Sequence, residues 1–184
     1  MPLIKDDRLV EDPWVPAEDE GPLPLEPRVI VGLARWQAGR EELLARNAPL
    51  GIRLTSDQAP AVIAEDLGHF DLVALEFPKF TDGRAYSYAR LLRERYGFTG
   101  ELRAVGNVLR DQLVFMQRCG FDAFEVVDEA ALDGWRKAVR EISVRYQPAA
   151  DRRPWAAALR HGGTSDLPAA VAGQQAPVIA CAAE

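Results

Sequence analysis

The fold is decided by a strand–helix–strand pattern in residues 72–105, which read LVALEFPKFTDGRAYSYARLLRERYGFTGELRAV. The apolar runs at its two ends, 72–77 and 102–105, are short and rich in the residues typical of β-strands. The segment 85–96 between them has a helical pattern and stops at Gly97, where a helix end needs a left-handed residue. The stretch therefore predicts a β-α-β unit.

The same alternation extends in both directions along the chain. Strand-like runs occupy 29–33, 52–54, 72–77, 102–105 and 123–127, and helical patterns occupy 36–47, 59–67, 85–96, 110–119 and 129–146. Strict alternation predicts an α/β fold of five β-α units with a mainly parallel sheet. Five strands are too few for a closed eight-stranded barrel, so the sheet is an open doubly wound sheet or a half-barrel. Both arrangements place functional loops at the carboxyl ends of the strands.

Two segments of different composition flank the α/β domain, which we assign to residues 28–146. Residues 1–27 contain six prolines, which forbid a helix and allow at most an edge hairpin that pairs Leu3-Ile4 with Leu9-Val10. Residues 147–184 are rich in alanine and proline and show little periodicity. We predict an extended arm at the N-terminal end and a disordered tail at the C-terminal end.

The charge of the chain is concentrated in that arm. The 184 residues carry 22 Lys and Arg against 28 Asp and Glu, a net charge of −6, and residues 1–27 alone hold eight acidic and two basic residues. The rest of the chain is balanced, which excludes a basic nucleic-acid-binding domain. No apolar run approaches the length of a membrane span, and the two cysteines do not suggest a disulfide framework. We expect a cytoplasmic protein that contacts neither nucleic acid nor membrane.

Ionisable side chains gather in the loops after the third and fourth predicted strands. The candidates are Lys79, Thr81, Asp82, Arg84, Asn107, Arg110, Asp111 and Gln112. Three cations beside helix N-termini suit a small oxyanion, with Asp82 or Asp111 as the group that transfers a proton. The alternative is structural: Asp82-Gly83 makes a turn, and Arg110 and Asp111 face solvent on the first turn of a helix.

The sequence contains no standard cofactor or metal motif. Dinucleotide, nucleotide, nucleophile-elbow and paired-cysteine signatures are all absent. His69 and His161 have no metal-ligand partners at a suitable spacing. Cys119 shares a helix face with Leu113 and Met116, which favours core packing over a redox role. We therefore expect no cofactor and no metal.

Trp14 is the one aromatic residue of the acidic arm. The arm is either a solvated leader or a docking strip for a basic partner, with Trp14 as its anchor. A third arrangement is that Trp14 packs against the sheet of its own domain.

Four motifs resemble the bacterial Domain of Unknown Function 934 family. They are LEFPKFTDGR at 75–84, ARLLRERYG at 89–97, GELRAVGNVLRDQ at 100–112 and RCGFDAFE at 118–125, and the resemblance runs from Leu3 to about Tyr146. Members of this family are typically encoded beside the sulfite/nitrite reductase hemoprotein and sulfate-activation genes. The resemblance also implies an Asp at position 107, where this chain has Asn107. Asn can cap a helix but cannot accept a proton as Asp does.

The resemblance implies an accessory protein of assimilatory sulfate reduction. Its expected partner is the sulfite reductase hemoprotein or the electron-donor subunit of that enzyme, since no cofactor motif is present to carry electrons to sulfite. The alternatives are a small enzyme or binding protein for a sulfur or phosphate oxyanion, and a chaperone for assembly of the siroheme enzyme. The sequence leaves open whether the protein is catalytic.

Overall fold

A computed structural model describes residues 2–5, 8–126, 130–141, 144–151 and 155–160. They belong to two compact units, one formed by Met1–Ser143 and Ala149–Arg152 and the other by Val144–Pro148 and Arg153–Glu184. Of the predicted disordered tail, 147–184, residues 152–154 and 161–184 lie outside the described part, and His161 and Cys181 are among them.

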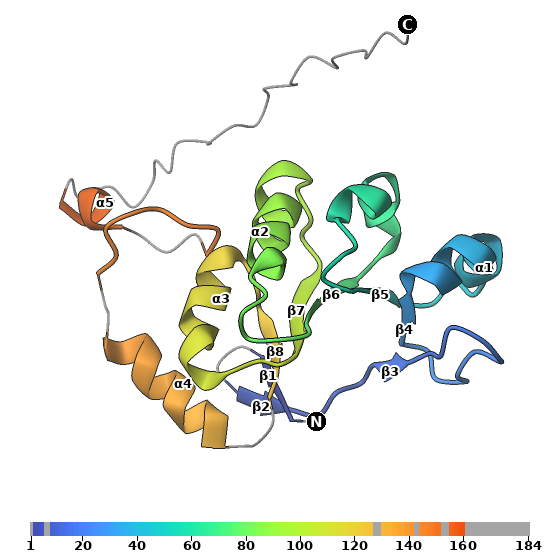
Figure 1. The fold of residues 1–184 in the computed structure, drawn as a ribbon, viewed down its shortest axis with the longest axis horizontal. Coiled ribbons are helices and arrows are strands. Elements are labelled where there is room, and N and C mark those ends of the chain that lie inside the picture. Colours follow the sequence, from blue (N-terminus) through green and yellow to red (C-terminus); the bar gives the residue numbers. More distant parts are fainter. Residues whose placement is uncertain (1, 6–7, 127–129, 142–143, 152–154, 161–184) are drawn as a thin grey trace, which may run out of the picture. The chain divides into compact units, whose positions relative to one another are not determined.

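One mixed, mostly parallel sheet forms the framework of the first unit (Figure 1). Its strands are β1 (Leu3–Lys5), β2 (Arg8–Val10), β3 (Val15–Pro16), β4 (Val29–Gly32), β5 (Leu50–Leu54), β6 (Leu72–Phe77), β7 (Glu101–Gly106) and β8 (Ala123–Glu125). Their order is β2-β1-β8-β7-β6-β5-β4-β3. Strands β3 to β8 are parallel, whereas β1 runs antiparallel to both β8 and β2.

This strand order decides between the two predicted sheets. Strands β3 to β8 follow one another in the sheet as they do in the chain, with no point at which the order reverses. Right-handed crossovers that always advance in one direction place every helix on the same face. The sheet is therefore a curled half-barrel, and the doubly wound alternative is wrong.

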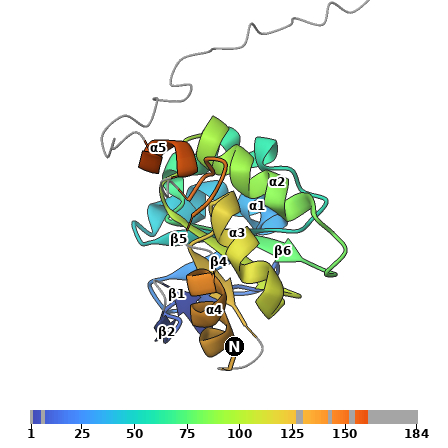
Figure 2. The same ribbon diagram turned by 90° about the vertical axis from the view of Figure 1, so that its left-hand side faces the viewer.

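The helices of the first unit are α1 (Leu33–Ala45), η1 (Pro60–His69), α2 (Arg84–Arg90), η2 (Leu91–Arg95), η3 (Arg110–Gln112), α3 (Leu113–Cys119) and α4 (Ala130–Glu141). Segment η1 has the narrower 3₁₀ geometry, and η2 is a π-helical turn that continues α2. Figure 2 shows α1, α2 and α3 together on one side of the strands.

The last predicted helix is shorter than its pattern suggested. We expected it to reach Tyr146, but the described part of α4 is Ala130–Glu141, and Val144 and Arg145 are not helical. In the second unit, which also holds α5 (Ala156–Arg160), Arg145 forms a bridge with Trp155, and Tyr146 is 86% exposed. The chain must leave helical geometry before Pro148, because the residue preceding a proline is pushed into extended conformations.

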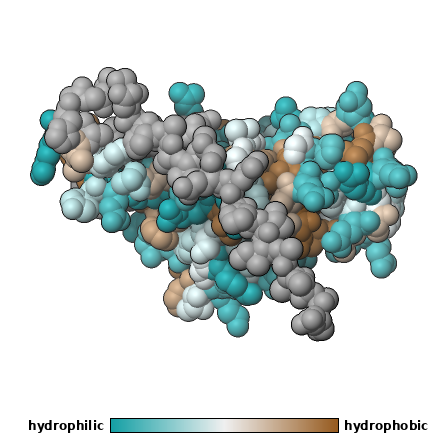
Figure 3. Space-filling model, turned by 90° about the horizontal axis from the view of Figure 1, so that it is seen from above, coloured by the Kyte–Doolittle hydropathy of each residue, from teal (hydrophilic) through white to brown (hydrophobic). Residues whose placement is uncertain are grey.

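The main core lies between the sheet and the helices. Alternate strand residues such as Val31, Ile52 and Leu75 point toward the buried helix residues Trp36 and Leu92. The other strand residues point to the opposite side, which we call the inner face. Its residues include Ile30, Arg53, Leu72, Ala74, Glu76, Glu101, Arg103 and Val105, as the alternation along each strand requires. The face that is visible in Figure 3 mixes hydrophilic residues with hydrophobic patches.

The N-terminal arm contributes strands to both edges of this sheet. Strand β1 lies beside β8, and β3 lies beside β4. The chain between them, which we call the crossing segment (residues 11–14), therefore passes over the inner face. It carries Trp14, which is 9% exposed and clusters with Ile30 and Leu72.

Candidate functional site

The carboxyl ends of β6 and β7 are held together by a tight turn at Gly106. This residue has φ +89°, and a Cβ atom there would lie 2.7 Å from the carbonyl oxygen of Phe77. The next amide, that of Asn107, donates a hydrogen bond of 2.7 Å to the same oxygen. Only glycine adopts this conformation without strain, so the two predicted loops start from one fixed point.

Arg84 joins the loop after β6 to the loop after β5. Its Nη2 atom donates to Asp82 Oδ2 at 2.7 Å and to Ser56 Oγ at 2.8 Å, while Nε donates to Asp82 Oδ1 at 3.0 Å. The hydrogen bonds from the Arg84 guanidinium and its backbone amide hold the pKa of the Asp82 carboxyl well below its usual range. Asp82 is therefore a permanent anion at neutral pH and a poor proton acceptor.

Most of the remaining predicted residues face solvent. Lys79, Thr81, Asn107, Arg110 and Asp111 are exposed, and Gln112 is half-buried. Gln112 Nε2 donates to the carbonyl oxygen of Phe80 at 3.4 Å, a long contact that links the two loops.

The structure thus brings Asp82 and Arg84 together but leaves the second predicted pair apart from them. Within the described residues, no hydrogen bond or ion pair joins Arg110 or Asp111 to Arg84 or to its partners Asp82 and Ser56. The stem of Arg110 instead lies against Gly134 of α4, where a Cβ atom would overlap it. The predicted residues form an exposed strip along the edge and make no convergent acid–base pair.

Sequence reasoning missed several residues at this edge. Ser56 is 8% exposed and receives Arg84, although 28 positions separate the two residues. Thr55 Oγ1 donates to Asp57 Oδ1 at 2.6 Å and lowers the pKa of that carboxyl. Three large apolar side chains are also exposed here: Phe80 at 60%, Leu109 at 39% and Phe115 at 55%. The sequence signal for Phe80 was the position of an aromatic residue in an otherwise polar loop.

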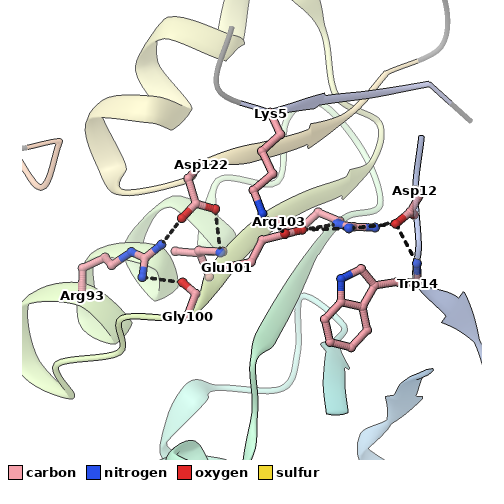
Figure 4. Close-up of polar contacts among 9 residues, drawn as sticks. Lys5, Asp12, Trp14, Arg93, Gly100, Glu101, Arg103 and Asp122 are labelled. Carbon is pink, nitrogen blue, oxygen red and sulfur yellow. Dashed lines mark hydrogen bonds and ion pairs between the residues drawn. The ribbon is translucent and has the colours of Figure 1, made fainter. Parts of the chain in front are cut away.

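The inner face carries charged residues that alternate with core residues. Arg103 is 2% exposed, and its guanidinium binds Glu101 Oε1 at 2.7 Å and Asp12 Oδ2 at 2.6 Å (Figure 4). Lys5 Nζ lies 2.6 Å from Glu101 Oε2. These four charges cancel, and they fasten β1 and the crossing segment to β7.

A second, more exposed pair on the same face joins Arg53 to Glu76 at 3.1 Å. A charged residue between apolar residues in β5, β6 and β7, as in Ile52-Arg53-Leu54, was the sequence signal for this polar face. Parallel sheets covered on both faces have continuous apolar runs instead.

Trp14 packs against the inner face of its own sheet. Figure 4 shows its indole ring beside the network, and its backbone amide donates to Asp12 Oδ1 at 3.1 Å. Since the ring is buried, a partner that approaches the arm meets the exposed carboxylates of residues 18–20 but not the indole.

Cys119 lies in the core, 4% exposed, and burial raises the pKa of its thiol. It is therefore protonated and shielded at neutral pH.

The described residues contain no group of three or more His, Cys, Asp or Glu side chains that could hold a metal ion, and His69 is exposed at the end of η1. No described helix has the length and hydrophobicity needed to cross a membrane.

A family model described as "Bacterial protein of unknown function (DUF934)" matches residues 51–156, more than half of the chain. The match covers β5 to α4 and so includes all the edge residues described above. No curated protein and no solved structure was found to match the chain.

Proposed function

The chain belongs to the bacterial DUF934 family, and we propose that it is an accessory protein of assimilatory sulfate and sulfite reduction that acts by binding another protein. The proposed partner is the sulfite reductase hemoprotein or its electron-donor subunit. The sulfur pathway comes from the gene neighbourhood implied by the resemblance. The mode of action, binding in place of catalysis, comes from the geometry of the strand edge.

The observation that supports a binding role is the exposure of the edge residues. An active site holds its acid, base and charged clamps in a shielded, converging arrangement. Here Lys79, Arg110 and Asp111 are exposed, and Arg84 is occupied by Asp82. Asp82 keeps its negative charge, and Asn107 has no carboxylate, so neither side chain is suited to transfer a proton at neutral pH.

One observation favours the alternative, a binding protein for a sulfur or phosphate oxyanion. Lys79 and Arg110 make no ion pair within the described residues, so both cations are available to an anion. Two exposed cations on separate loops bind a small anion weakly, because solvent screens them and no buried donor completes the site. For this reason we place protein binding first.

Co-purification tests the proposal. Tagged protein isolated at low salt should retain the reductase hemoprotein or its donor subunit, and a strain that lacks the gene should grow poorly on sulfate and normally on cysteine. Absence of both subunits from the isolate, together with normal growth on sulfate, would refute the accessory role. Binding of sulfite or phosphate that depends on Lys79 and Arg110, without retention of either subunit, would establish the alternative.

A further inference from the structure

We infer that Lys79, Phe80, Leu109, Arg110 and Phe115, which we call the edge patch, form the docking surface for the partner. This inference rests on the proposed binding function and adds the chemistry of the partner's surface. That surface is apolar at its centre and bordered by carboxylates. The inference comes from the exposure of three apolar side chains, their rigid support and the charges beside them.

The apolar part of the patch consists of three exposed side chains. Phe80 and Phe115 expose 60% and 55% of their surface, and Leu109 exposes 39%. A single exposed apolar residue is ordinary, but several at one edge mark a surface that another molecule covers. Aromatic side chains are also the residues that most often dominate the binding free energy of protein interfaces.

The patch is held in place from beneath. The Phe115 ring meets the Tyr86 ring edge-on at 4.9 Å between centroids, and Tyr86 meets the fully buried Phe77 ring at 5.1 Å. On the other side of α3, Leu113 and Met116 are fully buried. Phe115 is therefore oriented before a partner arrives, which reduces the entropy lost on binding.

The two loops and α3 present their apolar residues at the same edge. Gln112 contacts the carbonyl oxygen of Phe80 and lies one helical turn before Phe115. Leu109 precedes η3 directly, so it begins the same short segment. Gln112 thus links the segment that carries Leu109 and Phe115 to the loop that carries Phe80.

The charged residues of the patch indicate the chemistry of the partner's surface. Lys79 precedes Phe80 and Arg110 follows Leu109, and neither cation forms an ion pair within the described residues. In the first loop, the Asp82 carboxylate already offsets the charge of Arg84. In the second loop, Asp111 is an exposed acid next to Arg110. Carboxylates on the partner would complement Lys79 and Arg110. A symmetric contact with a second copy would instead bring these like charges together.

The test measures binding of the purified full-length chain to the reductase hemoprotein and to its donor subunit. The variant Phe80→Ser/Phe115→Ser should raise the Kd about 30-fold or more if both rings are energetic centres of the interface. The matched control Leu25→Ser/Val62→Ser removes residues that are 100% and 50% exposed outside the patch, and it should leave the Kd unchanged. Circular dichroism confirms that each variant is folded.

A second pair of variants tests the charges. Lys79→Glu/Arg110→Glu should slow association and reverse its dependence on salt, because the new carboxylates repel those of the partner and salt screens that repulsion. Lys137→Glu changes an exposed cation on α4 and should have no effect on the association rate.

The outcomes separate the two proposals. If the wild-type chain binds a subunit and the patch variants bind as the controls do, the docking surface is wrong and the binding function stands. If the wild-type chain binds neither subunit, the proposed function fails and the inference fails with it. Self-association that is lost in Phe80→Ser/Phe115→Ser, without binding to either subunit, would overturn the inference in favour of a second copy as the occupant.

Discussion

Removal of the Asp12 carboxylate tests how the crossing segment is fastened to the inner face. The Arg103 side chain is 3% exposed and donates to Asp12 at 2.6 and 3.0 Å and to Glu101 at 2.9 Å. With Lys5 on Glu101, the four charges sum to zero. In Asp12→Ala the buried guanidinium keeps one carboxylate, and the cluster acquires a net positive charge.

The expected loss of stability follows from this geometry. Removing one partner of a fully buried ion pair costs about 3–5 kcal/mol. The Asp12 side chain is 29% exposed and Glu101 remains in place, so we expect a decrease of about 2 kcal/mol in the free energy of unfolding. For a chain of this size each 1 kcal/mol corresponds to about 2–4 °C, so the Tm should fall by about 4–8 °C.

Urea unfolding followed by circular dichroism measures this loss. Glu11→Ala is the matched control, because Glu11 is an exposed acid one position away and the described residues show no ion pair for it. It should change stability by no more than about 0.5 kcal/mol. A double-mutant cycle that combines Asp12→Ala with Arg103→Met should give a coupling energy of about 1.5 kcal/mol or more. Equal effects of Asp12→Ala and Glu11→Ala would refute the argument that the ion pair holds the crossing segment.

Three further measurements follow from the geometry. Gly106→Ala should lose about 1–3 kcal/mol of stability in urea unfolding, because its Cβ would meet the Phe77 carbonyl oxygen, whereas Gly97→Ala, at φ +67° with open space around it, should lose less; equal losses would contradict the steric argument. In a carboxyl titration by NMR, Arg84→Ala should raise the pKa of Asp82 toward its ordinary value. The depressed pKa stabilises the fold above the unfolded-state pKa and this contribution is lost as the pH falls, so an unchanged pKa would contradict the pairing. In a Cys181→Ser variant, Cys119 should react with a thiol reagent at neutral pH only after denaturation, because its pKa is raised by burial; reaction in the native state would show that the thiol is accessible.

The local elements were largely predictable from the sequence. The expected strand 72–77 coincides with β6, and 102–105 lies within β7, because short apolar runs between turn residues have few alternative structures. The choice between a half-barrel and a doubly wound sheet was not predictable, since it depends on which strands become neighbours. The place of Trp14 was open for the same reason: its contacts lie on strands distant in sequence.

In the candidate site, too, the local features were predictable and the tertiary contacts were not. The loops that carry it could be named from strand ends alone, and the Asp82–Arg84 pair lies within two residues. The link from Arg84 to Ser56 and the separation of Arg110 from Asp82 depend on tertiary structure. Alternation within the strands would have revealed the polar inner face, because Arg53 and Arg103 occupy positions opposite the core residues.

The measurement that tests the account most directly is the affinity of the wild-type chain for the sulfite reductase hemoprotein and for its donor subunit, at about 50 mM and about 300 mM salt. The account predicts a saturable complex with one of the two subunits, weaker at the higher salt and weakened further by Phe80→Ser/Phe115→Ser. Absence of a complex with either subunit at the lower salt would contradict it.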